Sequence, residues 1–154
     1  MEPTDNEIRE VVQSTWYAFL SAEVEPMGPG DPSPGSGTPG DGALLGRVAI
    51  DGAWQGEVLI GCDESLGRTA AATFFALPPE EVGQTEIHDT IAELANVLGG
   101  NLKCLLPPGC QLSLPRVDAQ ANGDLPMGGA VGFRCEGQPF WVALRRRSQP
   151  PLTG

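Results

Sequence analysis

One face of a predicted helix carries the side chains of this sequence that are best suited to chemistry. Residues 89–103, "DTIAELANVLGGNLK", place Asp89, Glu93, Asn96 and Gly100 within a narrow arc, because successive residues of a helix turn by about 100°. The opposite face is apolar and forms a core side: Ile87, Ile91, Leu94, Ala95, Leu98 and Leu102. A carboxylate can pair with a cation, and a carboxamide both donates and accepts hydrogen bonds. The arc could therefore bind and orient polar groups of another molecule.

The same arc also has a plain structural explanation. Exposed helix faces are polar, and Asp, Glu and Asn are ordinary surface residues. Gly99 and Gly100 follow Asn96, and each costs a helix about 1 kcal/mol relative to alanine. These two residues could let another backbone approach the arc, or they could mark a kink or local packing against a sheet. Spacing alone leaves both explanations open.

Other catalytic groups are sparse in the sequence. The single histidine, His88, falls off the polar arc on the flank toward the core side, and we expect a structural role for it. The four cysteines form no C-x-x-C pair: Cys62, Cys104, Cys110 and Cys135. Zinc sites need closely spaced Cys and His ligands, so we expect no metal site and mostly buried, reduced thiols.

Composition and charge exclude several classes of protein. The formal net charge of −11 argues against nucleic-acid binding, which needs clustered Lys and Arg. The only basic run, residues 145–147, is typical of a solvated strand end, although it could also dock an acidic partner. No apolar stretch of about 18 residues occurs, so no spanning helix is expected. The acidic N-terminus does not resemble a secretory signal, and we expect a cytoplasmic protein.

The first half of the chain predicts a helix followed by a hairpin. Helical spacing of apolar residues predicts a helix over residues 5–23, with Thr4 and Glu7 as its capping box. Residues 25–42 are almost all Pro, Gly, Ser and Asp, which predicts a disordered loop inside one domain of residues 1–154. Residues 43–61 hold two alternating apolar runs around Asp51-Gly52, a strong hairpin signal.

The second half predicts two helices and then strands. A helix over residues 63–77 ends at Pro78, and the helix with the polar arc spans about residues 85–106. Residues 111–119 alternate as a strand, in which Pro115 indicates an edge or a bulge. Residues 128–147 give two strands joined at Glu136-Gly137. Because hairpins dominate, the predicted class is α+β, with a largely antiparallel sheet and long helices packed on one face.

Residues 89–103 resemble the signature of the CheC/CheX/FliY phosphatase family. That pattern is Asp or Ser, three residues, Glu, two residues and Asn, which Asp89, Glu93 and Asn96 match in order and spacing. The flanks are also similar to CheX-like domains, namely residues 7–26, 56–77 and 106–117. The chain has a single copy of the motif, which favours CheX over CheC or FliY. The Pro/Gly-rich loop is longer than the family pattern.

The resemblance implies hydrolysis of the phospho-aspartate of CheY-like response regulators. Asn96 would then enter the regulator's active site and orient the attacking water, and Glu93 would pair with the regulator's active-site Lys. Asp89 would support the contact, with Gly99 and Gly100 letting the partner approach. The regulator would supply its own Mg²⁺ and Lys, so the protein needs no cofactor and no nucleophile of its own.

The sequence leaves two rival functions open and also suggests a homodimer. The chain could bind response regulators without turnover, as a flagellar-switch-like or scaffold module. It could also be an unrelated α+β domain with a chance motif, which burial of Asn96 against the sheet would favour. The resemblance further implies pairing through sheet edges, and the apolar run "FWVAL", residues 140–144, suggests a homodimer at that edge.

Overall fold

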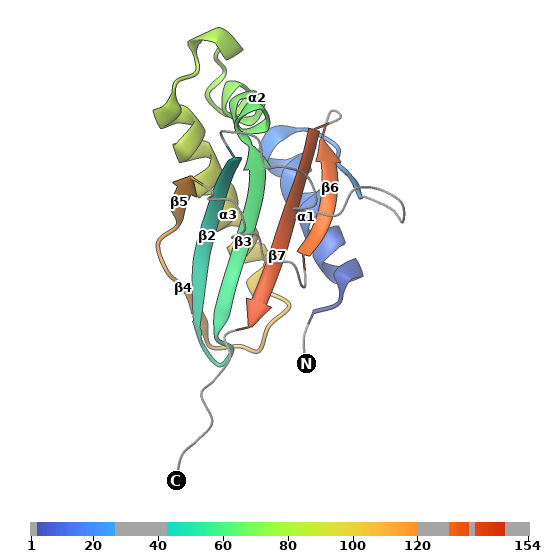
Figure 1. Ribbon diagram of the computed structural model, residues 1–154. Helices are drawn as coiled ribbons and strands as arrows, with labels where there is room; N and C mark the ends of the chain where they lie inside the picture. The colour runs from blue at the N-terminus through green and yellow to red at the C-terminus, as the bar shows by residue number, and fades with distance from the viewer. Residues whose placement is uncertain (1–2, 27–42, 120–129, 136–137, 147–154) are drawn as a thin grey trace.

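Helices cover one face of a single antiparallel sheet. The computed structural model describes residues 3–26, 43–119, 130–135 and 138–146. Within these ranges, three α-helices lie on the same face of a seven-stranded sheet (Figure 1). The elements in chain order are α1 (Asp5–Leu20), β1 (Glu25–Pro26), β2 (Ala43–Gly52), β3 (Gly56–Asp63), α2 (Glu64–Phe75), the 3₁₀ turn η1 (Pro79–Glu81), α3 (Gln84–Lys103), β4 (Cys110–Leu112), β5 (Arg116–Ala119), β6 (Ala130–Cys135) and β7 (Gln138–Arg146). The predicted α+β class is confirmed.

Every pair of neighbouring strands in the sheet is antiparallel. The strands run β1-β6-β7-β3-β2-β4, and β5 pairs with the same edge of β2 as β4 does. All six strand pairs of the described sheet are antiparallel, and two of them, β2–β3 and β6–β7, are hairpins. The predicted strand over residues 111–119 is split into β4 and β5, with Pro115 in the break. Its place on a sheet edge confirms the interpretation of that proline.

The β2–β3 hairpin is confirmed, but its turn lies later in the chain than predicted. Ile50 pairs with Gly56, so the chain reverses over residues 53–55. Gly52 instead pairs with Cys110 of β4 and has a φ of 116°. A Cβ atom there would clash with the carbonyl oxygen of Gly109, so only glycine fits. Pairing with β4 therefore decides where the turn forms.

The first helix starts at a capping box, and the first two helices each end at a left-handed residue. The Thr4 hydroxyl accepts from the Glu7 N–H, and the Glu7 carboxylate accepts from the Thr4 N–H, which confirms the capping box of α1. This helix ends at Leu20 rather than residue 23, because Ser21 is left-handed with a φ of 54°. Ala76 ends α2 in the same way, with a φ of 55°, two residues before Pro78.

Two predicted loops lie largely outside the described residues. Glu25 and Pro26, the start of the predicted loop over 25–42, form the short strand β1 and pair with β6. Residues 27–42 lie outside the described part of the chain, as does the predicted joint at residues 136–137. The loop prediction is therefore wrong for its first two residues, whose backbone finds hydrogen-bond partners on a sheet edge.

The strand expected at a dimer edge is an interior strand. Residues 140–144 belong to β7, which pairs with β6 on one side and with β3 on the other. The backbone hydrogen-bonding groups on both sides of β7 are thus used within the chain. The prediction of a homodimer formed at this strand is therefore wrong. Pairing through sheet edges stays a prediction, and the edges of the described sheet are β1 and the β4–β5 side of β2.

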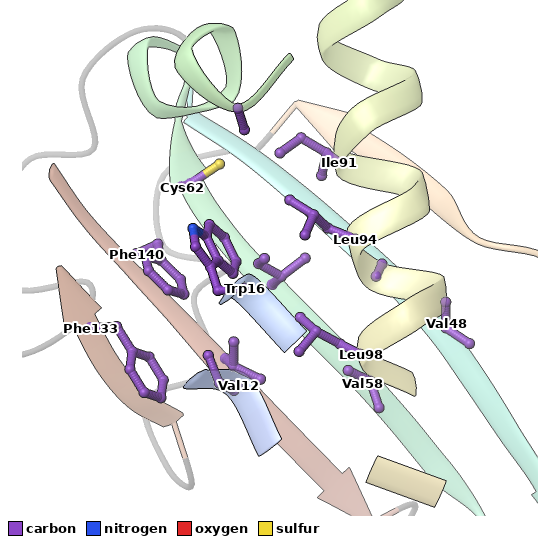
Figure 2. Close-up of a cluster of buried hydrophobic side chains, with 14 of the residues drawn as sticks. Val12, Trp16, Val48, Val58, Cys62, Ile91, Leu94, Leu98, Phe133 and Phe140 are labelled. Carbon is purple, nitrogen blue, oxygen red and sulfur yellow. The ribbon is translucent and has the colours of Figure 1, made fainter. Parts of the chain in front are cut away.

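The hydrophobic core fills the space between helices and sheet and fixes how α3 is turned. Figure 2 shows Ile91, Leu94 and Leu98 of α3 pointing toward strands β2 and β3. Trp16 of α1 stacks on Phe140 of β7 with ring centroids 4.2 Å apart. Burial of the apolar face of α3 leaves its opposite face directed away from the sheet. Among the helices that the structure describes, none is long and apolar enough to cross a bilayer.

Candidate functional site

The helix α3 is a continuous 20-residue element that holds the candidate site residues at fixed spacing. At its start, the Glu86 carboxylate accepts from the Gly83 N–H at 2.8 Å. Its core side is formed by eight buried residues: Ile87, Thr90, Ile91, Leu94, Ala95, Leu98, Gly99 and Leu102. Seven of the eight are apolar or glycine; the Thr90 hydroxyl donates to the Glu86 carbonyl at 2.7 Å and so needs no outside partner. This packing sets the rotation of the helix.

The polar arc faces away from the core, as the sequence predicts. Asp89 and Glu93 are exposed, and Asn96 and Gly100 are half-buried. Within the described part of the chain, the side chains of Asp89, Glu93 and Asn96 make no hydrogen bond or ion pair. Glu93 and Asn96 are three residues apart and so lie about 4.5 Å apart along the helix axis. A carboxylate and a carboxamide are thus presented together to an incoming molecule.

The two glycines of this helix take different positions. A Cβ atom on Gly100 would have no heavy atom within 4 Å, so this residue lies on the open arc. Gly99 is buried, and its Cβ would contact Leu112 and Val48 at 3.5 Å. Gly99 therefore packs locally against the sheet, which was one of the two explanations open from the sequence. Gly100 lies on the same face of the helix as Glu93 and Asn96.

A hydrogen bond between helices steadies the end of α3 and was missed by sequence reasoning. The Asn101 amide donates to the hydroxyl of Thr15 on α1 at 2.8 Å. Thr15 is buried with 1% of its surface exposed, so the bond satisfies a polar group inside the helix layer. The signal available in the sequence is a threonine among the apolar positions of the first helix. Thr15 thus ties α1 to the flank of the polar arc.

The histidine and the cysteines stand apart from the arc. His88 is exposed on α3 but off the arc. Cys62, Cys110 and Cys135 are buried and Cys104 is exposed, all as free thiols, which confirms that the thiols are mostly buried. Burial, together with the neighbouring Asp63, raises the pKa of the Cys62 thiol to about 12. In the ranges covered by the structure, no group of three His, Cys, Asp or Glu side chains could hold a metal ion.

Comparison with known families decides what kind of protein carries this arc. Residues 44–133 match the family model described as chemotaxis phosphatase CheX. That span is more than half of the chain and includes all of α3. The chain belongs to the CheX family. The family predicted from the sequence is therefore confirmed. No curated protein sequence matches this CheX-family chain.

Solved structures of low sequence identity share the fold of this CheX-family chain. A CheC-like superfamily protein from Shewanella sp. PV-4 is 17% identical with a TM-score of 0.73, covering 95% of this chain and 99% of its own. CheX from Vibrio vulnificus is 16% identical with a TM-score of 0.70, covering 92% and 95%. A CheX-CheY-BeF3-Mg²⁺ complex from Borrelia burgdorferi gives 18% identity and a TM-score of 0.70, covering 92% and 96%. The CheX-like fold thus extends over nearly the whole chain.

Proposed function

We propose that this CheX-family protein hydrolyses the phospho-aspartate of a CheY-like response regulator. The observation that carries the proposal is the pair Glu93 and Asn96 on the outward side of α3, with no side-chain partner among the described residues. The family is described as a chemotaxis phosphatase, and one solved relative is a complex with CheY, BeF3 and Mg²⁺. We further expect the protein to act in the cytoplasm, where such regulators are found.

The proposed reaction needs little from the phosphatase itself. Water attacks the phosphorus, the bond from phosphorus to the aspartyl oxygen breaks, and the products are a free carboxylate and inorganic phosphate. An acyl phosphate is already activated, and the regulator contributes Mg²⁺ and a Lys that neutralise charge on the phosphoryl group. What remains is to hold a water in line with the leaving oxygen. No nucleophile or metal of this chain takes part.

Asn96 is the residue proposed to hold that water. A carboxamide accepts a hydrogen bond from the water through its oxygen and can donate to a phosphoryl oxygen through its nitrogen. Orienting the water in this way lowers the entropic part of the barrier without a proton transfer to the protein. Rigid attachment to a helix whose opposite side is fully buried keeps the amide in place.

Glu93 is proposed to anchor the regulator by pairing with its active-site Lys. Its position one turn before Asn96 lets both side chains address one target. A charge-assisted bond formed on docking, where water is excluded, is stronger than the same bond in solvent. Asp89 lies one further turn back and supports the contact electrostatically, while Gly100 leaves space for the regulator's backbone.

A dephosphorylation assay on a panel of phosphorylated receiver domains tests the proposal. We expect Asn96→Ala to lower kcat by about 100-fold or more, since loss of one positioned polar group typically costs that much, while binding largely survives. Glu93→Ala should raise the Kd for the regulator as well as lower the rate. His88→Ala is the matched control, because it removes an exposed polar side chain of the same helix off the arc.

The outcomes separate the proposal from its main alternative. Wild-type activity in both variants would reject the mechanism. Tight binding of receiver domains without phosphate release by the wild type would instead identify a binding module of the flagellar-switch kind.

A further inference from the structure

Three phenylalanines, of which Phe74 and Phe75 are exposed and Phe19 is half-buried, form an aromatic cluster on the helix layer. Phe19 of α1 stacks on Phe74 of α2 with ring centroids 4.7 Å apart, and Phe75 meets Phe74 edge-on at 5.1 Å. Phe74 is 42% exposed and Phe75 is 38% exposed. We call Phe19, Phe74 and Phe75 the aromatic cluster. Each of these rings would gain from being covered, because burying an aromatic side chain removes a large apolar area from water.

Phe19 of the aromatic cluster lies close to the part of α3 that carries the candidate site. Thr15 of α1 bonds to Asn101 of α3, and the two helices run in opposite directions (Figure 1). Phe19 is one turn further along α1 than Thr15. Because the helices are antiparallel, Phe19 lies level with Val97, which is one turn before Asn101 on α3. Val97 is half-buried and is only one turn from Glu93 on the same helix. The axis of α1 at Phe19 is therefore about one helix diameter, roughly 10 Å, from the axis of α3, and Phe74 stacks on Phe19 there.

A protein that engages Asn96 through an interface of ordinary size can reach the aromatic cluster as well. A standard interface buries about 800 Å² on each partner, which corresponds to a disc of roughly 16 Å radius. A disc of that size centred on Glu93 and Asn96 reaches the neighbouring turn of α1, where Phe19 stacks on Phe74 of α2. We propose that the aromatic cluster is the apolar anchor through which the phosphorylated receiver domain docks, an inference that rests on the proposed function.

The anchor and the arc have complementary tasks. Glu93 and Asn96 offer one ion pair and a few hydrogen bonds, whereas burial of aromatic side chains contributes a large part of the binding energy of many interfaces. The partner that fits is a receiver domain with an exposed apolar patch next to the Lys of its active site, because the arc itself is acidic. The aromatic cluster would add apolar affinity to the ion pair of Glu93, and Asn96 would set the rate.

Separate measurement of kcat and KM tests this inference on a receiver domain that the wild type hydrolyses. Phe74→Ser and Phe75→Ser should each raise KM, and the Kd for the regulator activated with BeF3 and Mg²⁺, by about 10-fold with kcat within twofold of wild type. Phe75→Ser leaves the stack of Phe19 on Phe74 in place, so it keeps the test valid if Phe74→Ser unfolds. Tyr17→Ser is the matched control, since Tyr17 is 62% exposed on α1 but lies about 200° around the helix from Thr15.

The possible results distinguish this inference from the proposed function. If the wild type hydrolyses the regulator and both Phe variants keep the wild-type KM, the aromatic cluster is not the anchor, and the proposed function is unaffected. A lowered kcat at unchanged KM also overturns it, because the cluster would then shape α3 rather than contact the partner. If the only effect of both substitutions is to dissociate a dimer of this chain, the aromatic cluster binds a second copy of the chain and the inference is wrong. A wild type without phosphatase activity overturns the proposed function first.

Discussion

At the scale of single residues, Asn96 occupies a position that a better helix former would stabilise. Asparagine is less favourable than alanine in a helix interior by roughly half a kcal/mol, and its amide makes no bond within the described chain. Asn96→Ala should therefore fold at least as well as the wild type. Lost turnover in that variant would reflect the missing amide rather than unfolding, which makes the substitution a clean test of the site.

The Cys62 thiol gives a pH-dependent prediction for stability. The unfolded thiol ionises near its ordinary pKa of 9.0, but burial and Asp63 raise the folded pKa to about 12. Below pH 9 both states hold the proton, so the full stability is present. Between pH 9 and 12 only the unfolded state releases its proton, and the free energy of unfolding should fall as pH rises, by up to about 1.4 kcal/mol per pH unit. Urea unfolding from pH 8 to 10.5 measures this slope.

Cys62→Ala supplies the control for that slope. The variant is less stable at every pH because it leaves a small cavity, but its loss of stability between pH 9 and 10.5 should be shallower than that of the wild type. Equal slopes in the two proteins would show that Cys62 does not titrate with the raised pKa.

At the scale of elements, a glycine in α3 and a glycine beneath it should respond in opposite ways to alanine. Gly100 faces open space, so Gly100→Ala should raise the free energy of unfolding by about 1 kcal/mol through helix propensity. Gly46 of β2 lies under the helix, where a Cβ would meet the Cγ2 atoms of Ile91 and Ile60 at 2.9 and 3.0 Å. Gly46→Ala should therefore cost about 1–3 kcal/mol by pushing α3 from the sheet. Urea unfolding of both variants at pH 7 measures the difference.

The Gly100→Ala variant also probes the proposed docking. Gly100→Ala should raise KM for the regulator although it stabilises the helix, because the added methyl group lies on the face that the partner approaches. A more stable Gly100→Ala protein with wild-type KM would show that the regulator's backbone does not come close to this residue.

At the scale of the whole molecule, the free edges of the sheet limit how two copies could pair. The edge strand β1 has two residues, including Pro26, and the opposite edge is broken at Pro115 between β4 and β5. Short, proline-containing edges disfavour strand addition. If the predicted homodimer forms, the β4–β5 edge is the better candidate, because Leu114 beside it is 86% exposed.

Sedimentation at micromolar concentration tests that assembly. We expect a dimer of the wild type to shift to a monomer in Leu114→Asp, since a charge would be buried at the edge without a partner. Glu25→Lys, on the opposite edge, is the control. A monomeric wild type would remove the homodimer, and a dimer insensitive to Leu114→Asp would place the interface elsewhere.

The sequence by itself determined the local elements and the polar arc. Apolar spacing at a helical period places Leu94 and Leu98 on one side of α3 and Glu93 and Asn96 on the other, and this information is contained in adjacent turns. The capping box at Thr4 is equally local. The arc could be predicted because a helix has one geometry, so the positions of its side chains follow from residue numbers alone.

Only the tertiary structure decided what surrounds that arc. It placed the run at residues 140–144 inside the sheet, turned Gly99 toward Val48, joined Thr15 to Asn101 and brought Phe19 onto Phe74. Each of these contacts joins segments far apart in the chain or depends on strand order. The physical reason is that alternation and helical period fix which face of an element is apolar, whereas the neighbour that covers the face is chosen by packing of the whole core.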